Sequence, residues 1–354
     1  MARFDFASDN AAGAMPEVME ALSKWNGGFE EAYGADQASR RAGDLIREML
    51  DADAEVWFVA SGTAANALCF AALAQPHEAI LAHRFSHAAN AEAGAPAFFG
   101  GGLAIAPLDG EGGLIAPASL ATALADLEET HRQAPAVLSL TQASEQGTLY
   151  APTRLASLVG MAREAGLRVH VDGARLANAV AAGFDPTSLA RAVAAAVIGG
   201  TKAGATPTEA IALFDKSLSR RFAGRLKHAG QLVSKSRFLS VPWIGMLESG
   251  AWVSRACHAN AMAQRLAELT PFPIAHPVET NAVFMTMDEA AFERLAASGW
   301  VLYRFEDGSV RALCSWATSL EDVEALAADL MVAADPGAAA DKGAAKRAWA
   351  GLRR

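Results

Sequence analysis

An aspartate and a lysine, whose side chains can both take part in catalysis, lie at or just after the ends of two apolar runs in this sequence. Asp172 ends the run "LRVHVD", and Lys202 stands thirty residues later in "GGTKAG", between small residues that let a ligand come close. A lysine that reacts through its amine must lie in a pocket and be deprotonated part of the time, which suits a strand end lined by glycine and threonine. An isolated lysine is more often simply exposed, and the residue order here is not that of a P-loop. The pair is therefore more informative than either residue alone.

The carboxyl ends of parallel strands are where open α/β sheets bind ligands. An aspartate and a lysine at two such ends indicate pyridoxal 5'-phosphate as the cofactor, with a Schiff base on Lys202 and with Asp172 keeping the pyridine nitrogen protonated. The protonated ring can then accept electrons from a bond broken at the Cα of a substrate. The competing interpretation, a surface ion pair between Asp172 and Arg175, explains neither the apolar run before the aspartate nor the lysine.

A cofactor phosphate needs N–H donors, and one segment offers them. In "ASGTAANAL" (60–68), Ser61, Gly62 and Thr63 open a helix, where free N–H groups and the helix dipole favour an anion. Serine and threonine are also ordinary N-caps, so the motif is weak in isolation. Its position directly after a long apolar run strengthens it.

Apolar runs alternate with helical patterns through most of the chain, and the runs lack a clean polar alternation. Such a pattern predicts a parallel sheet covered by helices on both faces. Helices are expected over 117–131 and 153–166, among others. The predicted strands are 56–61, 79–83, 103–108, 136–142, 167–172, 194–200 and 210–215.

The pattern changes after the last of these strands. Residues 218–268 are mainly helical, and residues 273–333 read β-α-β-β-α, beginning with a strand at "PIAH" (273–276). The tail is rich in alanine, glycine and basic residues, a composition that favours disorder. We predict an N-terminal segment that contributes to the active site (1–30), a large cofactor-binding domain (31–250), a small C-terminal domain (251–335) and a flexible tail (336–354).

The bulk composition limits the class of protein. A formal charge of -9 and a pI of about 5.4 give no electrostatic support for nucleic-acid binding. The three cysteines lack paired spacing, so neither a disulfide framework nor a metal site is expected. The apolar run 56–74 is nearly long enough to span a bilayer, but the polar residues in its middle favour a strand, a turn and a buried helix. No signal peptide is evident, and we expect a cytoplasmic protein.

Several longer motifs, taken together, carry a specific resemblance. "DGAR" and "GGTK" at a thirty-residue spacing, followed by "KHAGQLVSK", discriminate better than any one motif. From about residue 4 to residue 330 the chain resembles the low-specificity L-threonine aldolases, of the threonine aldolase and beta-eliminating lyase family. The resemblance implies an α/β protein of the aspartate aminotransferase fold type I, with a large, mostly parallel seven-stranded sheet domain plus a small C-terminal α+β domain. Other matching segments are 6–22, 32–37, 62–66, 86–96, 141–150, 226–252 and 310–318.

The resemblance also implies roles for individual residues, matched position by position. The implied catalytic residues are Lys202, His87, His131 and Asp172, with His87 stacking on the cofactor ring. The implied cofactor-binding residues are Ser61, Gly62, Thr63, His87, Asp172, Arg175, Thr201, Lys202 and Lys227. The implied substrate-binding residues are Ser8, Tyr33, Arg175 and Arg311, with Tyr33 reaching in from a partner subunit.

Some of these residues have simpler explanations that the sequence leaves open. His131 fits an ordinary histidine at a helix C-terminus equally well. Arg311 could be a solvated charge on a strand, and His87 a core histidine. The pair Cys257 and His258 lacks a second ligand pair and is interpreted as helix packing.

The implied activity is the cleavage of L-β-hydroxy-α-amino acids to glycine and an aldehyde. L-Threonine and L-allo-threonine are expected substrates, with phenylserine or β-hydroxyaspartate as further ones. Alternatives are another reaction of the same cofactor, such as β-elimination or transamination, or a cofactor-binding protein without turnover. Where the family has asparagine and histidine, this chain has Ala203 and Phe29, and the latter favours an aryl group. The resemblance also implies at least a homodimer, and we expect a homotetramer.

Overall fold

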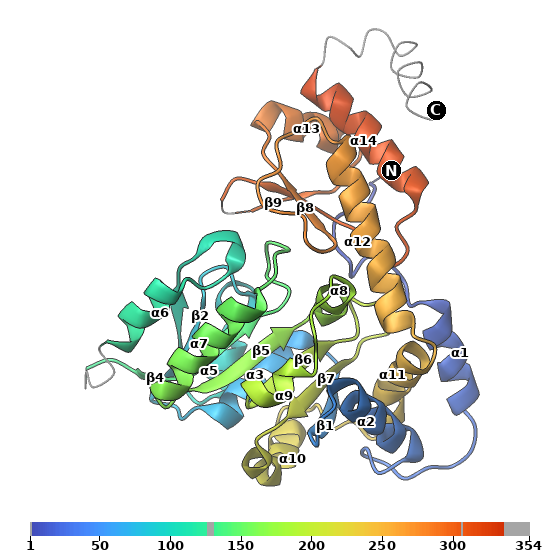
Figure 1. The fold of residues 1–354 in the computed structure, drawn as a ribbon. Coiled ribbons are helices and arrows are strands. Elements are labelled where there is room, and N and C mark those ends of the chain that lie inside the picture. The colour runs from blue at the N-terminus through green and yellow to red at the C-terminus, as the bar shows by residue number, and fades with distance from the viewer. Residues whose placement is uncertain (1, 126–130, 306, 336–354) are drawn as a thin grey trace.

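The computed structural model describes residues 2–125, 131–305 and 307–335, which form two sheets with their helices (Figure 1). The predicted tail and part of the helix predicted over 117–131 lie outside the described residues, and α6 covers Pro117–Leu124. The apolar run 56–74 forms a strand, a turn and the buried helix α3 (Gly62–Leu73), as predicted. None of the helices in the described ranges is long and apolar enough to cross a bilayer.

All seven strands predicted for the first part of the chain are present, and they form one sheet in the order β1-β7-β6-β5-β4-β2-β3. The pairs β2–β3, β2–β4, β4–β5 and β5–β6 are parallel, whereas β7 is antiparallel to both β6 and β1. The prediction of a mostly parallel seven-stranded sheet is confirmed. The strands span Glu55–Val59 (β1), Glu78–His83 (β2), Ala104–Leu108 (β3), Ala134–Thr141 (β4), Arg168–Gly173 (β5), Ala195–Gly199 (β6) and Glu209–Leu213 (β7).

Side chains of these strands reach a separate core on each face of the sheet. Leu81 and Leu138 pack in the core that includes α2, α7 and α11, whereas their chain neighbours Ile80 and Val137 pack in the core that includes α3 and α10. Successive strand side chains point to opposite faces, so a strand buried on both faces reads as a continuous apolar run. The helices of this part are Pro16–Trp25 (α1), Gln37–Leu50 (α2), α3, His87–Asn90 (α4), Ala95–Phe99 (α5), α6, Pro152–Glu164 (α7), Leu176–Ala181 (α8), Ser188–Ala192 (α9), Ser219–His228 (α10) and Arg237–Glu248 (α11).

The small domain follows α11. The long helix α12 (Ala251–Leu269) runs from the large sheet region to the small domain, where it packs against α14 (Leu320–Ala334) (Figure 1). Between them, β8 (Ala282–Met285), α13 (Glu289–Ala297), β9 (Tyr303–Arg304) and β10 (Val310–Leu313) follow in chain order, and the antiparallel sheet has the order β8-β10-β9. The strand predicted at 273–276 is reduced to one bridge, from Ile274 to Met285. Proline at positions 273 and 277 removes two N–H donors there.

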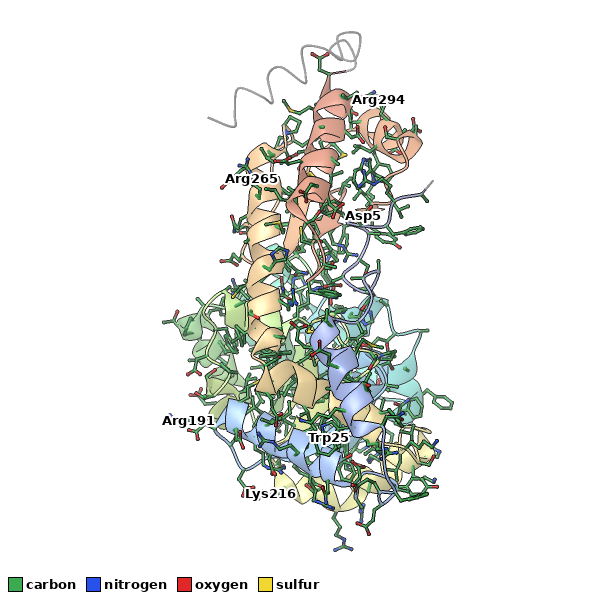
Figure 2. The ribbon with its side chains drawn as sticks, turned by 90° about the vertical axis from the view of Figure 1, so that its right-hand side faces the viewer. Asp5, Trp25, Arg191, Lys216, Arg265 and Arg294 are labelled. Carbon is green, nitrogen blue, oxygen red and sulfur yellow. The ribbon has the colours of Figure 1, made fainter. Side chains whose placement is uncertain are left out.

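The start of the chain lies against the small domain. Arg3 pairs with Trp300, and the N–H of Leu313 donates to the carbonyl oxygen of Phe6 at 2.9 Å. Figure 2 shows Asp5, Arg265 and Arg294 in this half of the molecule, and Trp25, Arg191 and Lys216 in the other. The N-terminal residues therefore pass from the small domain to the large one, between the two sheets.

Candidate active site

The "DGAR" and "GGTK" segments end neighbouring parallel strands. Asp172 of β5 lies in register with Val197 of β6, and Lys202 follows three residues after the end of β6. A Cβ on Gly199 would lie 2.0 Å from the carbonyl oxygen of Ala174, so only glycine lets the two strand ends come this close. This geometry brings the predicted carboxylate and amine to one edge of the sheet.

The carboxylate of Asp172 is buried and held by two donors. Its Oδ1 accepts the N–H of Ala174 at 3.0 Å, and its Oδ2 accepts Nδ2 of Asn66 at 2.9 Å. Burial opposes ionisation, but the charge of Lys202 and the hydrogen bond from Asn66 hold the pKa of Asp172 below its ordinary value. The group is therefore a fixed anion, which fits the protonated pyridine nitrogen of pyridoxal phosphate.

The first turn of α3 lies after β1 and fits the phosphate. Ser61 caps the helix, its Oγ accepting the N–H of Ala64 at 3.3 Å. The N–H groups of a helix's first turn have no intrahelical acceptor, and the dipole adds positive potential there. Gln231, just beyond α10, accepts the N–H of Ala60 at 3.0 Å and so fixes the approach to this turn. The predicted residues Gly62 and Thr63 provide two of the free N–H groups.

Lys227 and Tyr33 lie together close to this region. The Nζ of Lys227 is 4.8 Å from the ring centroid of Tyr33, whose N–H donates to the carbonyl oxygen of Ser234 at 3.0 Å. Helix α10, which carries Lys227, packs against α3. Tyr33 is half exposed and Phe29 is fully exposed. The segment around them thus exposes two aromatic side chains.

Arg175 is buried in a fully formed ion pair. Its Nε and Nη2 donate to the two oxygens of Asp9 at 2.7 and 3.1 Å, and its Nη1 lies 3.7 Å from Oε2 of Glu145. Burial, which opposes ionisation of both groups, is outweighed by their mutual attraction, so the pKa of Asp9 is lowered and that of Arg175 is raised. Ser8 precedes Asp9 directly, and the N-terminal segment thus reaches Arg175.

Arg311 of β10 differs from Arg175 because its Nε is buried and has no hydrogen-bond partner among the described residues. Its guanidinium carbon lies 5.7 Å from the ring centroid of Tyr303 and 5.0 Å from that of Phe305. Burial, followed by the charge of Arg175, lowers the pKa of Arg311 to about 10. A partly buried cation with an unused donor fits a carboxylate that arrives with the substrate.

His87 begins α4 and is oriented by a carboxylate. Its Nδ1 lies 3.0 Å from Oε1 of Glu92, whose side chain is fully buried. This hydrogen bond raises the pKa of His87 above its ordinary value despite partial burial, and nearby charges include Glu145 and Lys202. The structure thus brings Lys202 within electrostatic reach of both His87 and Asp172, and Arg175 within reach of both Asp172 and Arg311.

One predicted residue lies away from the others, and a second has its hydroxyl bonded to the backbone. His131 is exposed and precedes β4, at the amino end of that strand, whereas Thr141 at its carboxyl end lies beside Asp172. The eight-residue strand spans about 23 Å, so the structure does not bring His131 to the site. The hydroxyl of Thr201 is engaged with the backbone of Thr208, where it ties the turn that carries Lys202.

Several polar residues of the site were missed from the sequence. Glu145 follows β4 at the same sheet edge as Asp172, so the strand-end rule that found Asp172 could have found it. Asp9 directly follows the predicted Ser8. Asn66 and Glu92 lie on the inner side of α3 and after α4, and only the tertiary structure joins them to Asp172 and His87.

Glu209, also missed, is a buried acid next to the lysine turn. Its Oε2 accepts the N–H of Gly200 at 2.8 Å. Burial, only partly offset by this hydrogen bond and by Lys202, raises the pKa of Glu209 to about 7. The folded protein therefore binds a proton at Glu209 more tightly than the unfolded chain does.

This difference predicts a pH-dependent stability effect. The stability linked to protonated Glu209 is fully present below its unfolded pKa of 4.5 and is lost as the pH rises through about 7. Glu209→Gln keeps an acceptor for Gly200 without a charge. Relative to the unchanged protein, its free energy of unfolding should therefore increase by up to about 3 kcal/mol from pH 4.5 to pH 8. Denaturant titrations of both proteins across this range measure the change, and a difference that is constant with pH would contradict it.

The fold and this set of residues define a pyridoxal-phosphate-dependent enzyme of fold type I. A structure of an SPT with PLP has the same fold, with a TM-score of 0.66 at 16% identity over 93% of this chain and 86% of that chain. The chain belongs to the beta-eliminating lyase family, whose model matches residues 5–290, and it is a lyase.

Individual relatives narrow the comparison. The chain is 42% identical to the low specificity L-threonine aldolase of Pseudomonas sp. over 333 residues, which cover 92% of this chain and 96% of the relative. A threonine aldolase of Leishmania major superposes with a TM-score of 0.86 at 26% identity, over 92% of this chain and 98% of that one. The resemblance to the threonine aldolases is therefore confirmed over most of the chain.

Proposed function

We propose that the chain cleaves L-β-hydroxy-α-amino acids, including L-threonine and L-allo-threonine, to glycine and an aldehyde. The observation that carries the proposal is the placement of Asp172 and Lys202 at one edge of the large sheet, and of Arg311, on the small domain, within electrostatic reach of Arg175, which also interacts with Asp172. The first two groups suit the cofactor and the third suits an amino-acid carboxylate. The similarity to low specificity L-threonine aldolases supports the same reaction.

In this proposal, Arg311 binds the α-carboxylate with its unused donor, assisted by Ser8. Arg175 already has Asp9 as its partner. It therefore contributes a fixed positive charge and a second contact with the substrate carboxylate. Holding the carboxylate would orient the substrate's Cα relative to the bound cofactor, and this orientation would select the bond that breaks.

The bond that breaks is Cα–Cβ. When bound, pyridoxal phosphate supplies the electrophilic ring that accepts the electron pair of this bond. Nε2 of His87 takes the proton of the β-hydroxyl, the C–O bond becomes the aldehyde carbonyl, and Cα regains a proton to give glycine. Asp172, held as an anion, would keep the ring nitrogen of the bound cofactor protonated, and Lys202 would attach the cofactor between turnovers.

The remaining parts of the proposal concern the phosphate and the assembly. Ser61, Gly62, Thr63 and Lys227 bind the phosphate, with Thr201 shaping the lysine turn. Tyr33 and the exposed Phe29 complete the site of a second copy in a homotetramer, and the protein works in the cytoplasm. Phe29 favours aryl substrates such as phenylserine, while Ala203 leaves room beside the cofactor.

A substrate panel tests the proposal. Glycine release should be seen with L-threonine and L-allo-threonine and not with D-threonine, because both arginines fix one face of Cα. Phenylserine and β-hydroxyaspartate are assayed in parallel. Their rates show which substituent the enzyme prefers on the carbon that becomes the aldehyde. Coupled assays for glycine, ammonia and oxo acids measure the products. Ammonia and an oxo acid without glycine would show β-elimination or transamination instead.

A further inference from the structure

Four residues form an unbroken series of hydrogen bonds under the proposed site. Nδ1 of His87 lies 3.0 Å from Oε1 of Glu92. Nδ2 of Asn66 donates to that same oxygen at 2.8 Å and to Oδ2 of Asp172 at 2.9 Å. Glu92, Asn66 and Asp172 are buried, and His87 is the open end of the series, with 34% of its side chain exposed. The proposed base, His87, is therefore linked to Asp172, the proposed partner of the ring nitrogen, through Glu92 and Asn66.

The hydrogen-bond pattern determines which nitrogen of His87 carries the proton. An ionised carboxylate only accepts hydrogen bonds, so Oε1 of ionised Glu92, which accepts an N–H from Asn66, accepts from the imidazole as well. Nδ1 must then be the donor, because a lone pair there would face the oxygen's own lone pairs. In the neutral ring, Nε2 is left with the free lone pair.

We propose that Glu92 is a positioning residue that keeps the proton of His87 on Nδ1 and that Asn66 joins it to Asp172. The proposal rests on the proposed function, in which Nε2 of His87 takes the proton of the substrate hydroxyl. Glu92 thus leaves Nε2 free as the base, and Asn66 holds two buried carboxylates apart while donating to both. A carboxylate that orients a histidine base through Nδ1 is a recurring arrangement in enzymes.

The charges around the pair set the expected direction of change. His87 faces Glu92, Glu145 and Lys202, and the hydrogen bond to Glu92 is the largest of the effects that raise its pKa. Glu92 faces His87, Asn66 and Asp172, and burial raises the pKa of Glu92. In Glu92→Gln, an amide oxygen accepts from Nδ1 at the same place without a negative charge. The pKa of His87 should therefore fall.

The test is a pH titration of the holoenzyme carrying Glu92→Gln. Histidine-selective NMR, with the His87 signal assigned from its loss in His87→Gln, should show His87 titrating at lower pH. The acid limb of the kcat/KM profile should move in the same direction, because the free base then persists to lower pH. Glu92→Ala, which removes the acceptor, should lower kcat roughly 10- to 100-fold.

A matched control separates this effect from the general loss of a buried acid. Glu209→Gln also removes a buried acid, yet Glu209 bonds to the turn at Gly200, so the His87 titration should stay in place. A His87 titration that is equally unmoved in Glu92→Gln would overturn the inference. Since NMR reads His87 directly, this result is obtained even if no glycine is released from L-threonine, an outcome that would overturn only the proposed function.

Discussion

Replacing Lys202 by alanine is expected to abolish both the visible absorbance of the bound cofactor and turnover. The amine is the attachment point in the proposed site, and its charge is one of the effects that lower the pKa values of Asp9 and Asp172. Alanine leaves the turn between β6 and β7 intact, because Thr201 and Thr208 tie it through other atoms. Turnover should fall by at least roughly 10³-fold, as when a covalent catalytic group is removed. Absorbance spectra and glycine release from L-threonine measure the two effects.

Lys216→Ala provides the matched control for this substitution. Lys216 is an exposed lysine of the large domain, paired with Asp53, and Figure 2 shows it at the end of the molecule opposite the small domain. The control should keep the absorbance and the activity. Retention of both by Lys202→Ala would show that another group attaches the cofactor and would remove the basis of the proposed function.

The sheet could be predicted because its strands are buried on both faces. Neighbouring residues such as Ile80 and Leu81 enter different cores, which leaves an apolar run that stands out between helices. The sequence could not reveal that β7 runs antiparallel, because local composition is the same in either direction. The strand expected at 273–276 is reduced to one bridge for a local reason, since Pro273 at its start and Pro277 directly after it have no N–H to donate.

The site residues that follow the ends of parallel strands could be predicted from the sequence. Those on helices and loops were harder to predict. Asp172 and Lys202 are adjacent because parallel neighbours end at one edge. His131 was chosen by its position in a motif, but it precedes β4, while Glu145 follows that strand and lies beside Arg175. Asn66 sits on a helix whose sequence shows only small and apolar neighbours, so its bonds to two carboxylates depend entirely on the tertiary fold.

The second large effect is expected from Arg311→Met. Its Nε is buried without a hydrogen-bond partner among the described residues. The substitution therefore breaks no hydrogen bond at that nitrogen, and folding should be little affected. Binding of the substrate carboxylate should suffer instead, because truncating one side of a buried charged pair costs about 2–5 kcal/mol. We therefore expect kcat/KM for L-threonine to fall about 30- to 5000-fold, mostly through KM. Steady-state kinetics of the variant measure the loss of substrate binding, and thermal melting of the same variant measures any loss of stability.

Arg175→Met, unlike Arg311→Met, should also lower the stability of the fold, and the contrast tests the assignment. Removing Arg175 leaves Asp9 buried and without its bidentate partner, which costs about 3–5 kcal/mol of stability. Arg304→Met serves as a control on the neighbouring strand, because Arg304 pairs with Glu289 at the surface and both properties should be nearly unchanged. If Arg311→Met lowered the melting temperature as much as Arg175→Met while KM stayed constant, Arg311 would be a structural cation. The carboxylate of the substrate would then have to bind through Arg175 and Ser8 alone.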